Sequence, residues 1–223
     1  MQPGTPSSEV LAALAAAECF AGLEPGVLAA LAAAFAPRDY DAGAVVFLEG
    51  EPGAGLYVVQ SGRLKGVKTS PAGREQVLRF LAAGDVFNEV AVLAGKPNQV
   101  TIIALEPSRL WVIHRDVLLR LMDEHPVLSR VLTLNLAQRV LHLLGIVEDL
   151  SLRSVEGRLA RLLLQQASAG GPWLSRTEMA ARLGTVPDVL NRALRTLADE
   201  GLVEIDRRQI RILNRQGLVE RGL

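Results

Sequence analysis

The chain has 223 residues, of which 49% are hydrophobic and 22% are charged, and its formal net charge is zero. These values describe a globular protein with enough apolar side chains for one or two packed domains. The single cysteine, Cys19, excludes an intrachain disulfide and leaves no set for a cysteine-bound cluster or zinc site, so we interpret it as a small buried hydrophobic residue. The first residues lack a basic start and no run approaches about 18 uninterrupted apolar residues, so we expect a cytoplasmic protein with no membrane contact.

The zero net charge hides a difference between the two ends of the chain. Residues 151–223 contain 12 arginines and 8 acidic residues, a balance of +4, whereas residues 1–150 contain 12 basic and 16 acidic residues, a balance of −4. All cations of the basic end are arginines, which suit bidentate contacts to guanine and to phosphate. The asymmetry favours nucleic-acid binding by the carboxy-terminal end.

Residues 9–36 are rich in Ala and Leu at helical spacing, and Gly22 with Pro25 indicates a break between two short helices. From residue 40 to 113 short β-rich runs alternate with turns: AVVFLE, GLYVVQ, GRLKGVKT, EQVLRFL, QVTIIAL and RLWVI. Strands of this length and spacing predict a compact antiparallel barrel or roll. No phosphate loop is predicted, because Gly95-Lys96-Pro97 lacks a following Ser or Thr.

Pro126 suits the first turn of a long helix that continues to about Leu150, a length of roughly 37 Å. Its apolar residues occupy more than one stripe, so one face can pack on the roll while another needs a further partner. A parallel second copy of the chain is the simplest such partner. Gly145 costs the helix about 1 kcal/mol relative to Ala, which suits a close approach of two backbones there.

After a boundary near residues 151–154, the sequence predicts an amphipathic helix, a helical hairpin and two strands, LVEI and IRIL, joined by DRRQ. In the hairpin, Ser175 stands three residues before Glu178, and Thr185 stands three before Asp188, so each helix is predicted to begin with a reciprocal cap. A turn at Gly184 makes this pattern typical of a helix-turn-helix, in which the second helix enters the DNA major groove.

Each helix of the hairpin is predicted to have one inward stripe. The expected inward residues are Met179, Ala180 and Leu183 on the first helix, and Val189 or Leu190, Ala193, Leu194 and Leu197 on the second. The second helix then turns Asp188, Asn191, Arg192 and Arg195 outward. Any helical hairpin with a solvated face gives the same pattern, and Arg207 and Arg208 between the strands fit either phosphate contact or simple solubility.

The order of a β-roll, a long helix and a winged helix-turn-helix resembles the Crp/Fnr family of bacterial transcription regulators. The resemblance covers nearly the whole chain, through LEGEPGAGLYVVQSGRLKG, LAAGDVFNEVAVLAGKPNQVTIIAL and SRTEMAARLGTVPDVLNRALRTLADEGLVEI. It implies an α+β protein with an antiparallel β-roll of the cyclic-nucleotide-binding type and flanking helices in residues 1–125, a dimerisation helix in 126–150 and a winged helix-turn-helix domain in 151–223.

The resemblance also implies roles for residues of the hairpin. The recognition helix would begin at Thr185, with Asp188, Asn191 and Arg192 at positions that contact base edges. An arginine forked onto guanine O6 and N7 discriminates by about 1–3 kcal/mol, and an aspartate can accept a hydrogen bond from cytosine N4. Arg176, Thr185 and Arg195 would contact phosphates. The family often has an arginine where this chain has Pro187, so one base contact is missing.

The effector segment departs further from the family pattern. Members that bind cyclic nucleotides have a Gly-Glu pair followed by an Arg and a Ser or Thr that hold the cyclic phosphate. Here the candidate pocket residues are Asn88, Glu89, Asn98 and Gln99: Glu89 is kept, Asn88 replaces the glycine, and Asn98-Gln99 stand at the other two positions. A buried phosphate needs a cation or several donors, and Lys96 is offset by two residues, so binding of cyclic AMP is not predicted.

Other cofactors have few possible ligands. Haem would need an axial ligand such as His142, His114 or His125, but a lone histidine is more often structural or exposed. No cofactor or metal is predicted, and an unknown small ligand or no ligand at all stays open. Glu89 with Asn88 and Asn98 makes no acid–base pair or nucleophile set, so we do not expect an enzyme.

We therefore expect a homodimeric regulator that binds near-palindromic double-stranded DNA and, as the resemblance implies, contacts RNA polymerase. The rival hypothesis is a ligand- or haem-sensing protein that acts through protein contacts without specific DNA binding. Pro187 and the modest charge of +4 motivate it.

Overall fold

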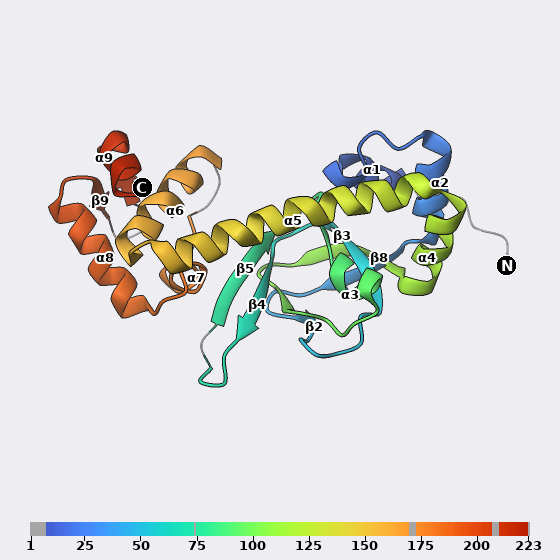
Figure 1. The fold of residues 1–223 in the computed structure, drawn as a ribbon, viewed down its shortest axis with the longest axis horizontal. Coiled ribbons are helices and arrows are strands. Elements are labelled where there is room, and N and C mark those ends of the chain that lie inside the picture. Colours follow the sequence, from blue (N-terminus) through green and yellow to red (C-terminus); the bar gives the residue numbers. More distant parts are fainter. Residues whose placement is uncertain (1–7, 74, 170–172, 207–209, 223) are drawn as a thin grey trace. The chain divides into compact units, whose positions relative to one another are not determined.

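The computed structural model describes residues 8–73, 75–169, 173–206 and 210–222 (Figure 1). The chain forms two compact units, one from residues 1–68 and 79–141 and the other from residues 69–78 and 142–223. The division falls inside the long helix rather than at its ends, where the sequence analysis placed the domain boundaries. The connection between two strands of the roll also belongs to the second unit.

The first unit begins with short helices, as predicted. These are α1 (Ser8–Ala16), the 3-10 turn η1 (Glu18–Phe20) and α2 (Pro25–Ala34). Gly22 takes a positive φ of 87°, which ends the first segment, and Pro25 occupies the first turn of α2, where its missing N–H costs no helix hydrogen bond.

Eight short strands form the roll in the described part of the chain. They are β1 (Ala36–Tyr40), β2 (Val45–Phe47), β3 (Gly55–Ser61), β4 (Leu64–Thr69), β5 (Glu75–Leu81), β6 (Val86–Phe87), β7 (Thr101–Ala104) and β8 (Ser108–His114). Their orders are β1-β8-β3-β6 in one sheet and β2-β7-β4-β5 in the other, with antiparallel pairing of β3 to β8 and of β4 to β7. The predicted roll is confirmed, and β1 and β6 are strands that the sequence analysis did not identify.

The central strands β3 and β8 bury both of their faces. Leu56 and Val58 on β3 point into a cluster with α1, α2 and α4, whereas the alternate residues Tyr57 and Val59 point between the two sheets. This alternation follows from the two-residue period of a strand. Because both faces are covered, these strands appear in the sequence as continuous apolar runs.

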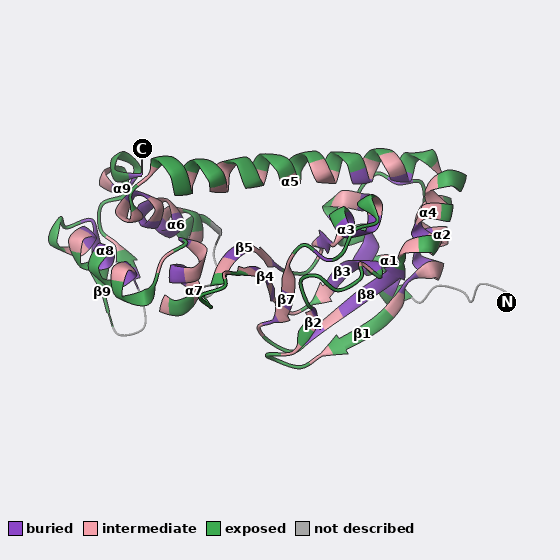
Figure 2. Cartoon of the chain, turned by 60° about the horizontal axis from the view of Figure 1, so that its bottom comes forward, coloured by how far each residue is buried: buried purple, intermediate pink, exposed green. Residues whose placement is uncertain are grey.

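Three helices follow or interrupt the roll: α3 (Glu89–Ala94), α4 (Arg115–Glu124) and α5 (Pro126–Leu152). The predicted long helix is thus present, beginning at Pro126. Leu128 and Leu132 of α5 are buried in the first unit, but most of the helix is exposed in the single chain (Figure 2). Its large exposed apolar residues are Val127, Leu134, Val140, Leu141, Leu143, Leu144, Val147, Leu150 and Leu152.

The second unit contains α6 (Val155–Ala169), α7 (Arg176–Arg182), α8 (Pro187–Asp199), β9 (Val203–Ile205), β10 (Ile210–Ile212) and α9 (Arg215–Arg221). β9 and β10 pair as an antiparallel hairpin, so the predicted helix, helix-turn-helix and small wing are all present. The last helix, α9, was not predicted. It packs on α6 through the buried Leu218.

Candidate functional site

The first helix of the hairpin, α7, begins with the predicted reciprocal cap. Ser175 Oγ accepts a hydrogen bond from the backbone N–H of Glu178 at 3.2 Å, and Glu178 Oε2 accepts one from the backbone N–H of Ser175 at 2.7 Å. Both bonds satisfy donors that the first turn of a helix otherwise leaves free. The predicted inward residues Met179, Ala180 and Leu183 are all buried.

The turn between the helices needs glycine at residue 184. Gly184 has a φ of 66°, and a Cβ there would lie 2.5 Å from Gln76 Oε1 and 2.8 Å from a methyl group of Leu150. The Gln76 side chain also donates a hydrogen bond to the backbone carbonyl of Arg182 at 3.2 Å. The left-handed backbone favours glycine at this turn, and a side chain there would also displace the ends of Gln76 and Leu150.

The predicted cap of the second helix is wrong. Helix α8 begins at Pro187, its N-cap is Val186, and no side chain caps it. Proline fixes φ at a helical value but restricts the residue before it to extended backbone, which makes Val186 the flanking residue. Thr185 instead lies in the turn, half-buried, and its N–H donates to the carbonyl of Ala180 at 2.9 Å.

The outward face of α8 is polar and exposed. Leu190, Ala193, Leu194 and Leu197 are buried as predicted, with Val189 at the edge, and Asp188, Asn191, Arg192 and Arg195 are all exposed. Within the described ranges, none of these four polar side chains forms an ion pair or hydrogen bond. The structure therefore brings the three predicted base-contacting residues, Asp188, Asn191 and Arg192, together on one free surface.

Several other arginines of the second unit are already bound to acidic side chains. Arg153 pairs with Glu148 and Asp149, Arg161 with Asp149, Arg211 with Glu204, and Arg221 with Glu200. Arg192 and Arg195 on α8 have no such partner among the residues described. The outward face of α8 therefore carries two arginines whose charge no acidic side chain compensates in the described part of the chain.

The remaining predicted phosphate contacts differ in their surroundings. Arg176 is half-buried, its Nη1 has no hydrogen-bond partner in the described part of the chain, and burial lowers the pKa of its guanidinium. A buried donor of this kind gains from an anionic acceptor. Arg207 and Arg208 of the wing lie outside the described residues.

In the effector segment, two asparagines bind each other. Asn88 Nδ2 donates to Asn98 Oδ1 at 3.1 Å and to the carbonyl of Gly55 at 3.0 Å, and Asn98 Nδ2 donates to the carbonyl of Leu48 at 3.3 Å. We call Asn88 and Asn98 the amide pair. Asn98 is buried with 3% exposure, so Asn88 Nδ2 and both polar atoms of the Asn98 amide are engaged inside the protein rather than directed at a ligand.

The other two predicted pocket residues lie differently. Glu89 is buried, with 3% exposure, and burial raises the pKa of its carboxyl, whereas the positive charges of Arg139 and Arg79 lower it. Gln99 is exposed, and its Nε2 donates to the carbonyl of Pro97 at 2.7 Å. Glu89, which follows Asn88 in the sequence, thus lies inside the protein, whereas the side chain of Gln99 is exposed.

The sequence analysis missed Arg139 of α5. Burial lowers the pKa of this guanidinium, and the carboxylates of Glu89 and Asp85 raise it. Its position contained a usable signal, because Arg139 follows the buried Leu132 by seven residues and therefore lies on the same side of the helix. Only the apolar residues of α5 entered the prediction.

The histidines and the cysteine have ordinary surroundings. His142 Nε2 lies 3.1 Å from the carbonyl of Leu78, His114 is exposed, and His125 is half-buried. Burial raises the pKa of Cys19 to about 11, with Asn135 lowering it and Glu89 raising it further. Such a thiol stays protonated and unreactive at neutral pH, and the described residues contain no group of three His, Cys, Asp or Glu side chains that could hold a metal ion.

Two domain models match this chain in the order that the structure shows. The cyclic nucleotide-binding domain matches residues 37–125, and the Crp-like helix-turn-helix domain matches residues 157–221. The first covers the β-roll with α3 and α4, and the second covers α6 to α9.

Two curated relatives match over most of their length. The chain is 31% identical over 219 residues to the CRP-like cAMP-activated global transcriptional regulator of Mycobacterium tuberculosis, which covers 94% of this chain and 98% of the relative. It is 30% identical over 189 residues to the cyclic AMP receptor protein of Thermus thermophilus, with 83% and 88% covered.

Solved structures show the same fold. A transcriptional regulator of the crp/fnr family from Eubacterium rectale has a TM-score of 0.77 at 24% identity, covering 93% of this chain and 98% of its own. FixK2 from Bradyrhizobium japonicum has a TM-score of 0.73 at 23% identity, covering 85% and 98%.

Proposed function

Because the chain belongs to the Crp/Fnr family of transcription regulators, we propose that it acts as a homodimer on a specific, near-palindromic DNA site. The observation that carries this proposal is the outward face of α8, which is exposed, polar and unpaired in the described residues. A helix of this kind, placed after a tight turn, suits the major groove. Action on DNA and contact with RNA polymerase imply a cytoplasmic protein, and both belong to the same proposal.

Arg192 is the residue that we assign to base recognition. Its guanidinium is free to fork onto guanine O6 and N7, and Asp188, one helical turn earlier, can accept a hydrogen bond from cytosine N4. Together they specify a G·C pair in each half-site. Arg195 and the partly buried Arg176 are assigned to phosphates, where they set position without selecting sequence.

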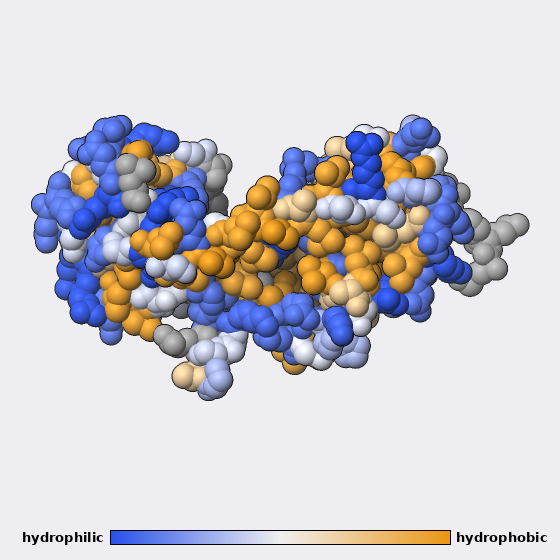
Figure 3. Space-filling model, viewed as in Figure 1, coloured by the Kyte–Doolittle hydropathy of each residue, from blue (hydrophilic) through white to orange (hydrophobic). Residues whose placement is uncertain are grey.

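The exposed side of α5 supports the homodimer. Leu134, Leu141, Leu144 and Val147 are between 57% and 68% exposed in the single chain, and Figure 3 shows hydrophobic side chains gathered along this helix. A water-exposed apolar stripe of this length is typical of a surface that a partner covers. A parallel second copy would cover it and set two α8 helices about 34 Å apart, one turn of B-form DNA.

The apolar side of α5 could also be buried in a lipid bilayer, since this helix is long and apolar enough to span one. Arg130, Arg139 and Asp149 argue against it, because charged side chains within a span are costly. Leu128 and Leu132 at the start of the helix are already packed in the core of the first unit.

We also propose that cyclic AMP does not control this regulator, in contrast to what the names of its two relatives state for those proteins. The amide pair occupies the positions at which the family pattern has a glycine and an arginine, and both amides are hydrogen-bonded to each other and to backbone carbonyls. A cyclic phosphate would have to break these bonds and would meet no guanidinium at residue 98. The regulator then acts without a ligand or with a different one.

Selection from a pool of random duplexes with the purified chain tests the DNA proposal. We expect enrichment of a near-palindrome whose half-sites are centred about 10 base pairs apart, each with a G·C pair that depends on Arg192. Absence of enrichment even at low salt, where phosphate contacts are strongest, would contradict the proposal. It would instead favour a sensor that acts through protein contacts.

A further inference from the structure

A second candidate site lies in the first unit, between the loop before β3 and the loop after α3. A cavity of about 450 Å³ is lined by Gly50, Pro52, Gly53, Gly95, Lys96, Pro97 and Arg115. Its volume is within the range of small-molecule sites, about 300–1,000 Å³. The exposed lining residues Gly50, Pro52, Lys96 and Pro97 leave it open to solvent.

Two loops that are tied together through their backbones form the walls. Pro52 and Pro97 face each other in an isolated antiparallel bridge, and the N–H of Asn98 donates to the carbonyl of Glu51 at 2.7 Å. At Gly53 a Cβ would lie 2.8 Å from the Cβ of Ala91 and 2.9 Å from the carbonyl oxygen of Lys96, so only glycine allows this approach. The loops around the cavity are therefore fixed in place before any ligand arrives.

Arg115 is fixed in a similar way. Its Nε donates to the carbonyl of Val92 at 2.8 Å, and its backbone N–H donates to the carbonyl of Ala54 at 3.0 Å. A Cβ on Gly95 would lie 3.2 Å from Arg115 Nη2, so the missing side chain leaves room for the guanidinium. The guanidinium thus keeps its two terminal nitrogens at a defined place beside the cavity.

Two cationic residues, Lys96 and Arg115, line this cavity. Lys96 is exposed, and its side chain has no ion-pair or hydrogen-bond partner among the residues that the structure describes. Arg115 forms an ion pair with Asp116 at 3.6 Å, and the Asp116 side chain is 92% exposed, so water screens this pair. The two acids of the loop before Pro52 are engaged elsewhere, Glu49 with Lys68 and Glu51 with the backbone N–H of Leu48.

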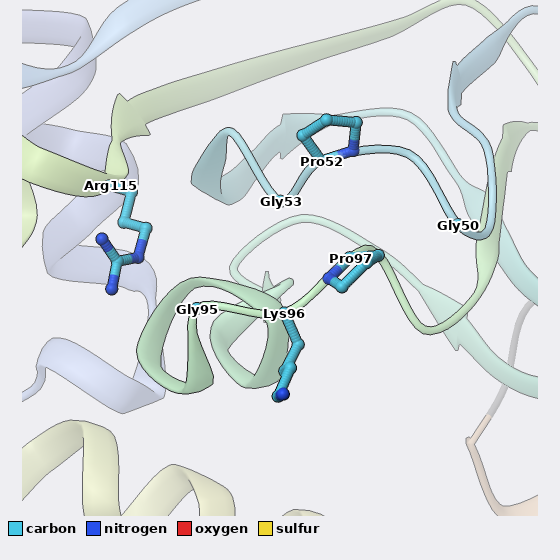
Figure 4. Close-up of a pocket in the computed structure, with 7 residues that line it drawn as sticks. All are labelled: Gly50, Pro52, Gly53, Gly95, Lys96, Pro97 and Arg115. Carbon is cyan, nitrogen blue, oxygen red and sulfur yellow. The ribbon is translucent and has the colours of Figure 1, made fainter.

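Figure 4 shows that the two cations come from different segments. Arg115 extends from the beginning of α4 and Lys96 from the loop after α3, and both side chains reach toward the lower part of that view. The loop from Lys96 to Asn98 therefore carries an exposed cation two residues before the buried amide. This loop thus has no cation at the buried Asn98 but has one at the exposed Lys96.

We propose that this cavity binds the phosphate group of a small phosphorylated molecule or free phosphate. A phosphate monoester carries about −1.5 to −2 charges at pH 7 and has three oxygens that can accept hydrogen bonds from a guanidinium and an ammonium. The guanidinium provides a fork for two oxygens and the ammonium a separate point charge. Pro52 and Pro97 supply apolar walls for the carbon part of an organic phosphate. The site does not depend on DNA binding.

Selective ¹⁵N-glycine labelling of the full chain provides the test, because Gly50, Gly53 and Gly95 report directly on the cavity. Titration with inorganic phosphate and with glycerol 3-phosphate, each at constant ionic strength set with chloride, is expected to shift these three signals saturably. Tighter binding of glycerol 3-phosphate identifies an organic ligand, and equal binding identifies free phosphate. Both results support the site.

Lys96→Gln and Arg120→Gln form the matched pair of variants. Each removes one positive charge from an exposed side chain, but only Lys96 lines the cavity. We expect Lys96→Gln to weaken phosphate binding about 10-fold, the effect of one charge-assisted contact, and Arg120→Gln to leave it unchanged. Shifts that do not saturate, or that weaken equally in both variants, would overturn the proposal.

Discussion

The outward face of α8 and the amide pair of the β-roll use similar side chains in opposite ways. On α8, Asn191 and Arg192 face solvent and have no partner among the described residues. In the roll, Asn88 and Asn98 use their amides on each other and on backbone carbonyls. Polar groups that are satisfied internally gain little from a ligand, whereas unpaired exposed groups are free to bind one. The comparison favours the outward face of α8, rather than the amide pair, as a surface that binds a ligand.

The largest effect is expected on the exposed apolar side of α5, which we propose that a second copy of the chain covers. Leu141 and Leu144 of α5 are 68% and 58% exposed, and burial of a leucine contributes about 1.5–3 kcal/mol. Leu141→Asp with Leu144→Asp affects four leucines in a dimer, so self-association should weaken by about 6 kcal/mol, or about 10,000-fold. Analytical ultracentrifugation measures the change. Ala42→Asp with Ala72→Asp adds the same charge on exposed loops and should leave the association intact.

Arg192→Ala removes the proposed base contact from α8. With about 2 kcal/mol lost in each of two half-sites, affinity for the selected site should fall about 1,000-fold, whereas affinity for random DNA should hardly change. Fluorescence anisotropy with both duplexes measures this difference. Arg195→Ala is the comparison variant and should weaken both duplexes equally. A uniform loss in Arg192→Ala would make Arg192 a phosphate contact.

The amide pair can be opened by restoring the family pattern. Asn88→Gly with Asn98→Arg removes the internal hydrogen bonds and supplies a guanidinium, and a charge-assisted contact contributes about 1.5–3 kcal/mol. Calorimetric titration should then show binding of cyclic AMP at least about 10-fold tighter than in the natural chain. Gln99→Ser alone should give no gain, because it leaves the amide pair closed and supplies no cation. If the double variant is folded by its thermal unfolding curve and gains nothing, the amide pair is not the barrier.

The smallest effect concerns Glu89, whose pKa burial raises above its ordinary value of 4.5. The folded state then holds the proton more tightly than the unfolded state, so this group favours folding below pH 4.5, and the contribution is lost as pH rises through the folded pKa. Glu89→Gln should therefore raise Tm at pH 7 by about 2 °C, a shift that less than about 1 kcal/mol produces in a chain of this length. The gain should vanish at pH 4. Glu106→Gln, at an exposed acid, should shift Tm at neither pH.

Elements with a strong local pattern could be predicted from the sequence. The six apolar runs of the roll, the helix from Pro126 and the cap of Ser175 on Glu178 all depend on neighbours along the chain, and the structure contains each of them. Two-residue β6 and the short α3 and α9 are too brief to show a period. The cap assigned to Thr185 failed because two local rules competed, and the restriction imposed by Pro187 won.

The candidate site was predictable only as far as residue types allowed. The outward face of α8 follows from helical spacing, so Asp188, Asn191 and Arg192 could be placed without a structure. The bond between Asn88 and Asn98 joins residues on either side of α3, and the fold brings them together. The sequence showed that the arginine of the family pattern is missing, but it could not show that the amides of Asn88 and Asn98 hydrogen-bond to each other instead. The effect of Arg139 on Glu89 could not be predicted for the same reason, because the two residues are far apart in the sequence and the fold brings α5 close to Glu89.

Asn88 has a φ of 73°, a left-handed value that glycine adopts freely and that asparagine tolerates better than most other residues. An exchange of glycine for asparagine at this turn therefore alters the chemistry of the segment without altering its path. A sensor domain can in this way lose nucleotide binding while its fold is retained. In such a regulator, control passes from the concentration of a messenger to the amount of protein that the cell makes.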